Sequence, residues 1–177
     1  MQRTTVTLLV AALVTLLGPM AIALAQSARD LGQWATYRNP KFGFAIEYPA
    51  GVLVPDPRPA PDAGALFASA DGKIRLLASA GSNETSESIE SYREFVLKEI
   101  YIGAAIDYAP VRKSWFVLSG TKDGETFYER ITFACEGRVI YGWQLRYPTS
   151  ERVQFDRVVE RIHRSYKPGR GEDGNCG

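Results

Sequence analysis

The stretch from Ser114 to Tyr147 reads SWFVLSGTKDGETFYERITFACEGRVIYGWQLRY, and its pattern decides the fold. In the last nine residues, positions 139, 141, 143, 145 and 147 are large and apolar, whereas Gly, Gln and Arg hold three of the four positions between them. This two-residue period predicts a β-strand with one face in a core and the other against polar surroundings. Residues 126–135 alternate in a similar way, with these residues on one face: Phe127, Ile131, Phe133 and Cys135.

Two tight turns would join three predicted strands into an antiparallel meander. Asp123-Gly124 is a strong hairpin signal, because Gly adopts positive φ without a steric penalty. This turn would pair Phe116 with Ile131. The first strand is apolar on both faces over residues 115–118, so we expect it to be central and covered on both sides.

The second turn is Glu136-Gly137-Arg138, and here the register decides the loop length. A three-residue loop pairs Phe133 with Tyr141 and Ile131 with Trp143, which keeps the large apolar residues of both strands on one face. A two-residue loop would shift the register by one residue and mix the faces. We therefore expect the three-residue loop.

A second hairpin and two helices are predicted outside the meander. Asp71-Gly72 would close a hairpin that pairs Phe67 with Leu76. Helical spacing of apolar residues predicts one helix over 87–102, capped by Ser86, and another that is capped by Thr149 or Ser150 and lasts to about Ser165. The two apolar stripes are Ile89, Tyr92, Val96 and Ile100 in the first helix, and Phe155, Val158, Val159, Ile162 and Tyr166 in the second.

The first 25 residues have the features of a secretory signal peptide. Arg3 gives a positive start, residues 6–17 form an apolar run of secretory length, and Ala23-Leu24-Ala25 is a small-x-small cleavage site. The run is short for a membrane span, and an uncleaved membrane anchor is the alternative. We therefore expect a periplasmic or secreted protein with no stable membrane anchor after cleavage.

Composition and charge limit the remaining classes of protein. The chain is 45% hydrophobic and 11% aromatic, which is enough for a packed core. Cleavage would remove one of the 21 Lys and Arg and none of the 20 Asp and Glu, so the mature net charge is zero. Nucleic-acid binding is therefore not expected. Residues 26–168 suit one domain, followed by a Gly-rich tail over 169–177.

Both cysteines, Cys135 and Cys176, follow the signal peptide, and an oxidising compartment favours one disulfide between them. Closing a loop of about forty residues would stabilise the fold by roughly 4 kcal/mol in the chain-entropy model. The bridge would attach the Gly-rich tail to the sheet. An intermolecular disulfide is one alternative; redox chemistry is another, although the short CxxC spacing of redox motifs is missing.

The opening residues Tyr37 to Pro49, YRNPKFGFAIEYP, resemble the start of PsbP-like domains, which begin with a similar aromatic hairpin closed by Tyr-Pro. The end is similar too, with a strand leaving at Tyr147-Pro148 and a helix closing on residues 162–166. The chain also looks like uncharacterised exported bacterial proteins of this type. The resemblance implies an α+β fold in which helices sandwich an antiparallel β-sheet of hairpins and a meander. It also implies an accessory or binding role without a shared catalytic set.

The polar face of the meander is the candidate ligand-binding surface. In the expected register, Arg130 lies opposite Gln144 and Tyr128 lies opposite Arg146, so these four side chains would come together. Guanidinium groups bind planar carboxylates and phosphates, which makes a small anionic ligand the expected occupant. The alternative is a solvated face, or arginine stems that pack beneath the first helix.

Catalytic chemistry has little support in the sequence. His163 is the single histidine, no nucleophile-elbow motif accompanies it, and we expect a structural or surface role for it. Glu129 interrupts the apolar face of its strand, either as a paired charge or as an acid in a pocket. A hydrolase would require Glu129, His163 and Glu47 to converge. No metal or cofactor is expected, because the two cysteines are better used as a disulfide than as zinc ligands.

Three functions follow as hypotheses. The first is a non-catalytic accessory or binding protein for another envelope or secreted protein. The second is a binder of a small anionic ligand at Arg130 and Arg146. The third is a hydrolase.

Overall fold

The computed structural model describes residues 31–58, 64–85, 87–172, 174 and 176. The predicted signal peptide, residues 1–25, lies outside the described residues, as does the predicted helix cap Ser86. Among the described residues, no helix combines the length and the apolar character that a membrane crossing needs.

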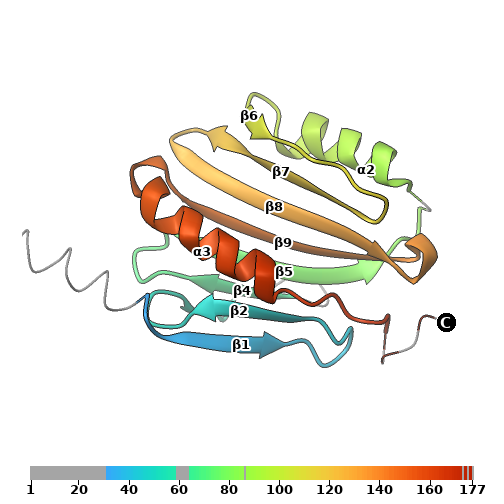
Figure 1. Ribbon diagram of the computed structural model, residues 1–177, viewed down its shortest axis with the longest axis horizontal. Coiled ribbons are helices and arrows are strands. Elements are labelled where there is room, and N and C mark those ends of the chain that lie inside the picture. Colours follow the sequence, from blue (N-terminus) through green and yellow to red (C-terminus); the bar gives the residue numbers. More distant parts are fainter. Residues whose placement is uncertain (1–30, 59–63, 86, 173, 175, 177) are drawn as a thin grey trace, which may run out of the picture.

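The described strands form two antiparallel sheets (Figure 1). A two-stranded sheet pairs β1 with β2, and a seven-stranded sheet has the order β3-β4-β5-β9-β8-β7-β6. The strands are β1 (Trp34–Arg38), β2 (Ala45–Pro49), β3 (Val54–Pro55), β4 (Ala65–Ala68), β5 (Arg75–Ser82), β6 (Ala105–Tyr108), β7 (Trp115–Lys122), β8 (Glu125–Ala134) and β9 (Val139–Pro148). The meander β7-β8-β9 therefore lies inside the large sheet, as the sequence predicted.

Helices cover both faces of the large sheet. Helix α3 (Arg152–Ser165) lies across one face beside the β1–β2 hairpin, and we call this the α3 face (Figure 1). Helix α2 (Ile89–Phe95) and the π-helix η1 (Val96–Ile100) that continues it pack on the other face, the α2 face. The predicted α+β fold, an antiparallel sheet sandwiched by helices, is confirmed.

Each face has its own hydrophobic core. The α3-face core includes Phe44, Ile46, Phe67, Tyr141, Trp143, Phe155 and Ile162. The α2-face core includes Ile89, Val96, Tyr101, Phe116, Leu118, Phe127 and Ile131. The apolar stripe predicted for the last helix is buried, since Phe155, Val158, Val159, Ile162 and Tyr166 are each less than 9% exposed.

Both hairpins closed by an Asp-Gly pair have the predicted register. Phe116 lies opposite Ile131 across the β7–β8 pair, and Phe67 lies opposite Leu76 across the β4–β5 pair. Residues Phe116, Val117 and Leu118 are buried, as expected for a strand covered on both sides. These short-range pairings follow from turn chemistry alone.

The β8–β9 register differs from the prediction by one residue. Four residues, 135–138, connect the strands, and Phe133 lies opposite Ile140 instead of Tyr141. The three-residue loop is therefore wrong. Its argument assumed that the apolar residues of both strands share one face, but both faces carry a core. Phe133 belongs to the α2-face core, whereas Tyr141 belongs to the α3-face core.

The first helix also departs from the prediction of one continuous helix over 87–102. It begins after the N-cap Ser88, whose hydroxyl accepts from the Ser91 backbone N–H at 3.1 Å. After Phe95 it widens into the π-helix, in which the Tyr101 N–H donates to the Val96 carbonyl at 3.0 Å. The extra residue in this turn leaves Ile100 43% exposed and buries Tyr101 instead. The predicted core position of Ile100 is therefore wrong.

The second helix has a short entry turn. Residues Thr149–Glu151 form a 3₁₀ turn, and α3 begins at Arg152 rather than directly after Thr149 or Ser150. A 3₁₀ turn at a helix start is common, and it leaves the apolar spacing of the helix unchanged.

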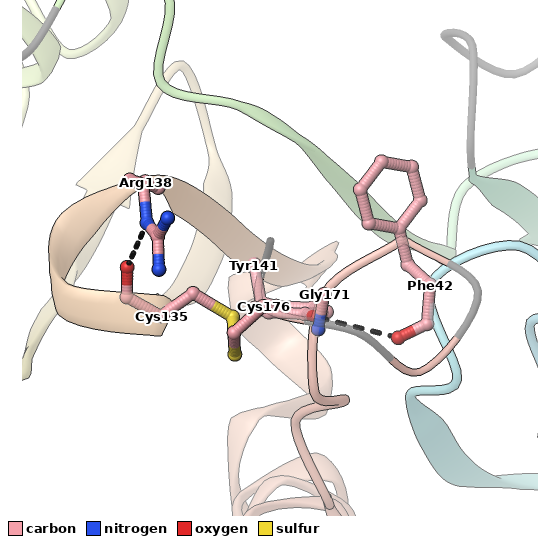
Figure 2. The surroundings of a disulfide bond; sticks show 6 residues. All are labelled: Phe42, Cys135, Arg138, Tyr141, Gly171 and Cys176. Atoms are coloured by element: carbon pink, nitrogen blue, oxygen red, sulfur yellow. Dashed lines mark hydrogen bonds between the residues drawn. A yellow bond between two sulfur atoms is a disulfide. The ribbon is translucent and has the colours of Figure 1, made fainter.

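The C-terminal segment packs against the sheet and is bridged to it by the Cys135–Cys176 disulfide, whose Cα atoms are 5.0 Å apart (Figure 2). The Tyr141 hydroxyl accepts from the Gly171 N–H at 2.8 Å and donates to the Phe42 carbonyl at 3.2 Å. Cys135 lies in the turn and not at the end of β8. The disulfide therefore joins the C-terminal segment to the turn between β8 and β9, and Tyr141 of β9 links the same segment to Phe42.

Candidate functional site

The four residues of the predicted anion site lie on two different faces of the sheet. In the observed register, Arg130 is opposite Trp143 and Tyr128 is opposite Leu145, on the α3 face. Gln144 and Arg146 alternate with Trp143 and Leu145 along β9, so their side chains lie on the α2 face. The prediction that all four side chains come together is wrong, because the observed β8–β9 register differs by one residue from the predicted one.

On the α3 face, Tyr128 and Arg130 meet His163 of α3. Arg130 Nη1 lies 3.3 Å from His163 Nε2 and must be the donor, because a guanidinium has no acceptor. Nε2 is therefore unprotonated, and Nδ1–H donates to the Tyr128 hydroxyl oxygen at 2.8 Å. The guanidinium also lies 4.8 Å from the centre of the Trp115 ring. These contacts fix the histidine as a neutral tautomer.

The surroundings of His163 keep it uncharged. Burial lowers its pKa, and the positive charges of Arg130 and Arg164 lower it further. Burial also raises the pKa of Tyr128 to about 12, so its hydroxyl stays protonated. His163 thus packs and hydrogen-bonds as a structural residue, in keeping with the role expected from the sequence.

The residues required for a hydrolase do not converge. Glu129 and Arg130 are neighbours in β8, so their side chains point to opposite faces of the sheet. His163 contacts Arg130 on the α3 face, away from Glu129. Glu47 lies in β2 and accepts from Arg161 Nε at 3.1 Å. The geometry offers no shared cleft for these three groups.

Glu129 is part of a polar cluster on the α2 face. Arg146 Nε donates to Gln144 Oε1 at 2.8 Å, and Gln144 Nε2 donates to the Tyr101 hydroxyl oxygen at 2.6 Å. Because Tyr101 accepts this bond, its own proton is left to point toward the nearby Glu129 carboxylate. The Tyr101 ring stacks on Phe127 with the ring centres 4.0 Å apart, which holds the hydroxyl in place.

A pocket of about 450 Å³ opens beside Glu129, and we call it the Glu129 pocket. Its floor consists of small residues of β5 and β9, which are Ser79, Gly81 and Gly142. Tyr92 of α2 and residues 82–85 form its rim. The hollow lies where α2 covers β7 and β8 and where Ser79, Gly81 and Gly142 of the neighbouring strands carry little side-chain volume.

One carboxylate oxygen of Glu129 has no protein partner. Oε2 is buried and makes no hydrogen bond with any described residue. Burial raises the pKa of Glu129, and this outweighs the lowering by the nearby Tyr101 hydroxyl, the Arg146 charge and the Gln144 amide. Burial and the nearby Glu129 charge together raise the pKa of Tyr101. The pocket therefore contains a poorly satisfied acid.

Sequence reasoning named Glu129 as a paired charge or a pocket acid, and the structure places it at a pocket. Tyr101 and Gly81 were missed. A π-helix leaves no simple periodic signal, so the burial of Tyr101 was not foreseeable from spacing. Gly81 contributes only because β5 pairs with β9, and that pairing joins segments about sixty residues apart in the chain.

In the part of the chain that the structure describes, no group of three or more His, Cys, Asp or Glu side chains is placed to hold a metal ion.

Comparison with solved structures finds a protein of similar fold. The chain is similar to cyanobacterial PsbP (CyanoP) from Synechocystis sp. PCC 6803, with a TM-score of 0.56 and 14% identity over 76% of this chain and 92% of that one. A crystal structure from Bacteroides thetaiotaomicron gives a TM-score of 0.41 and 13% identity over 71% of this chain and 44% of that one. No protein-family model matches the sequence. No curated protein matches it either. The similarity to CyanoP shows that the chain has a PsbP-like fold.

Proposed function

We propose that the protein is an exported, non-catalytic binding protein whose binding site is the Glu129 pocket. Export is supported by the predicted signal peptide over residues 1–25 and by the Cys135–Cys176 disulfide, a bond that persists in oxidising compartments. A non-catalytic role is supported by the separation of Glu129, His163 and Glu47 on different parts of the fold.

The observation that carries the proposal is Glu129 Oε2. Buried polar atoms in native proteins almost always have a hydrogen-bond partner, and a missing one costs about 1 to 3 kcal/mol. Here the unpartnered oxygen belongs to a residue that lines an open pocket. A ligand in the pocket that donates a hydrogen bond to the Glu129 carboxylate would reduce the cost of burying it, and the pocket has room for a small molecule.

Gly81 gives a direct way to test the pocket. A Cβ added at Gly81 meets no atom within 4 Å, and its backbone is not in the left-handed region, so a larger residue fits without strain. Gly81→Val would fill the pocket and suit a strand position. Thr36→Val is the control, because it introduces the same valine side chain at an exposed position of β1, away from the pocket.

The test is a fragment screen by saturation-transfer NMR with the wild type and both variants. We expect fragments that bind the wild type and Thr36→Val with similar signals and that lose at least tenfold in affinity with Gly81→Val. Fragments that bind Gly81→Val as well as the wild type, or no bound fragment at all, would overturn the pocket as the binding site.

An accessory role toward another protein is the second candidate, and it has its own observation. Seven large hydrophobic side chains among the described residues are exposed, and five of them lie in the segment from Phe95 to Val111. Exposed apolar side chains are typical of protein interfaces, which makes this segment the candidate interface. These are Phe95, Ile100, Ile102, Tyr108 and Val111.

Photo-crosslinking in the native envelope tests this second candidate. A photoreactive residue at Phe95 should capture one stoichiometric partner, whereas the same residue at Val153, which is 84% exposed on α3, should capture none. Equal capture from both positions, or none from Phe95 in a folded protein, would remove the accessory role.

A further inference from the structure

We infer that the Glu129 pocket binds a small organic cation, whose ammonium group pairs with the Glu129 carboxylate. This inference rests on the proposed function and names the ligand class for the same site. It replaces the anionic ligand expected from the sequence, since the charged groups at the observed pocket have the opposite sign.

The charges around the pocket favour a cation. The charged residues that line it are Glu84 and Glu129, and no Lys or Arg is among the described lining residues. The nearest guanidinium of the polar cluster is Arg146, whose Nε is bonded to Gln144. None of the salt bridges among the described residues includes Arg146 or Glu129. A cationic ligand would supply the missing counter-charge.

The walls of the pocket suit an ammonium attached to an apolar body. Tyr92 lies on the rim, and aromatic rings attract ammonium groups through their negative faces. Leu77, Ile131 and Ile140 add apolar surface, and the Ser79 hydroxyl lies on the floor. A small arylalkyl amine matches this combination in polarity and in size.

The same contacts predict that binding depends on pH. A cation next to Glu129 favours its ionised form, so binding should release a proton from any protein molecule in which Glu129 is protonated. The groups that face or approach Glu129 are Tyr92 of α2, Tyr101 after η1, Arg146 of β9 and Glu84 across the pocket. The two tyrosines stay protonated because burial raises the pKa of each.

Three probes of the same shape and different charge test the inference by calorimetry at pH 7: phenethylammonium, 2-phenylethanol and phenylacetate. We expect phenethylammonium to bind at least tenfold more tightly than 2-phenylethanol, and phenylacetate to show no binding. Glu129→Gln keeps the shape of the side chain and removes its charge. It should weaken phenethylammonium at least tenfold and leave 2-phenylethanol within twofold.

The outcomes separate the ligand class from the pocket itself. If 2-phenylethanol or phenylacetate binds as tightly as phenethylammonium and Gly81→Val blocks this binding, the inferred cationic ligand class is wrong. The Glu129 pocket then remains the proposed binding site. If phenethylammonium binds with unchanged affinity to Glu129→Gln, Glu129 is not its partner and the inference fails. If no probe binds the wild type, the inference fails as well, and the fragment screen with Gly81→Val then decides the proposed function.

Discussion

At the residue scale, the Glu129 carboxylate lowers the stability of the fold and provides the proposed binding group. Its folded-state pKa is raised above the ordinary value of 4.5, so above that pH the folded chain binds more protons than the unfolded chain. Stability therefore falls as the pH rises through this range. The effect is absent well below pH 4.5, where both states are protonated.

Glu129→Gln should consequently stabilise the protein at pH 7, by about 1 to 3 kcal/mol, because it removes a buried charge whose hydrogen bonding is incomplete. Urea denaturation at pH 7 and pH 4 measures this, and the gain should shrink at the lower pH. Glu125→Gln is the control on the same strand, because Glu125 pairs with Arg75 at 2.6 Å and its loss should be neutral or destabilising. A less stable Glu129→Gln at pH 7 would contradict the role given to this carboxylate.

His163 should make stability depend on pH in the opposite sense. Its folded-state pKa lies below the ordinary value of 6.5, so near and below that pH the unfolded chain binds more protons. Stability should therefore fall as the pH drops from 7.5 to 5.5. The change in urea midpoint over this interval should be smaller in His163→Gln than in the wild type. Parallel changes in the two proteins would show that His163 takes up its proton equally in both states.

At the element scale, the π-helix places Tyr101 over the sheet. Tyr101→Phe keeps the stacking on Phe127 but removes the acceptor of Gln144 Nε2. We expect a loss of about 1 to 2 kcal/mol in the free energy of unfolding, because a partly buried donor is left without its bond. Tyr108→Phe is the control, since Tyr108 is 55% exposed and should change stability little. Equal effects of the two changes would argue against the polar cluster.

The disulfide acts on a second element, the C-terminal segment. Replacing both Cys135 and Cys176 with serine should reduce stability by up to about 4 kcal/mol, because the unfolded chain regains the freedom of a long loop. Thermal unfolding of the double variant measures this loss. The wild type should run as a monomer on a denaturing gel without reductant. A dimer that separates into monomers when reductant is added would instead indicate an intermolecular disulfide.

At the scale of the whole molecule, the sequence predicted what short-range patterns control. The α+β class, the hairpin turn at Asp123-Gly124 and the buried stripe of α3 are correct, because each depends on neighbours in the chain. The predicted β8–β9 register was wrong because the sheet carries a core on each face. Ile131 and Trp143 belong to different cores, and alternation of apolar residues alone cannot tell the two faces apart.

The same scale explains the error in the candidate site. A one-residue register shift moves a side chain to the opposite face, which separated Arg130 from Gln144. The pocket itself depends on the long-range pairing of β5 with β9 and on where α2 ends. Glu129 alone was visible in advance, as a charge that interrupts an apolar strand.

The most direct test of the account is the titration of the Glu129 side-chain carboxyl, followed by carbon-13 NMR with Glu129→Gln used to assign the signal. We expect a pKa above the ordinary 4.5 in the free protein, and a lower value when phenethylammonium saturates the pocket. A pKa at or below 4.5 in the free protein would mean that Glu129 is already fully paired or solvated, and would contradict the central claim that one of its carboxylate oxygens lacks a partner.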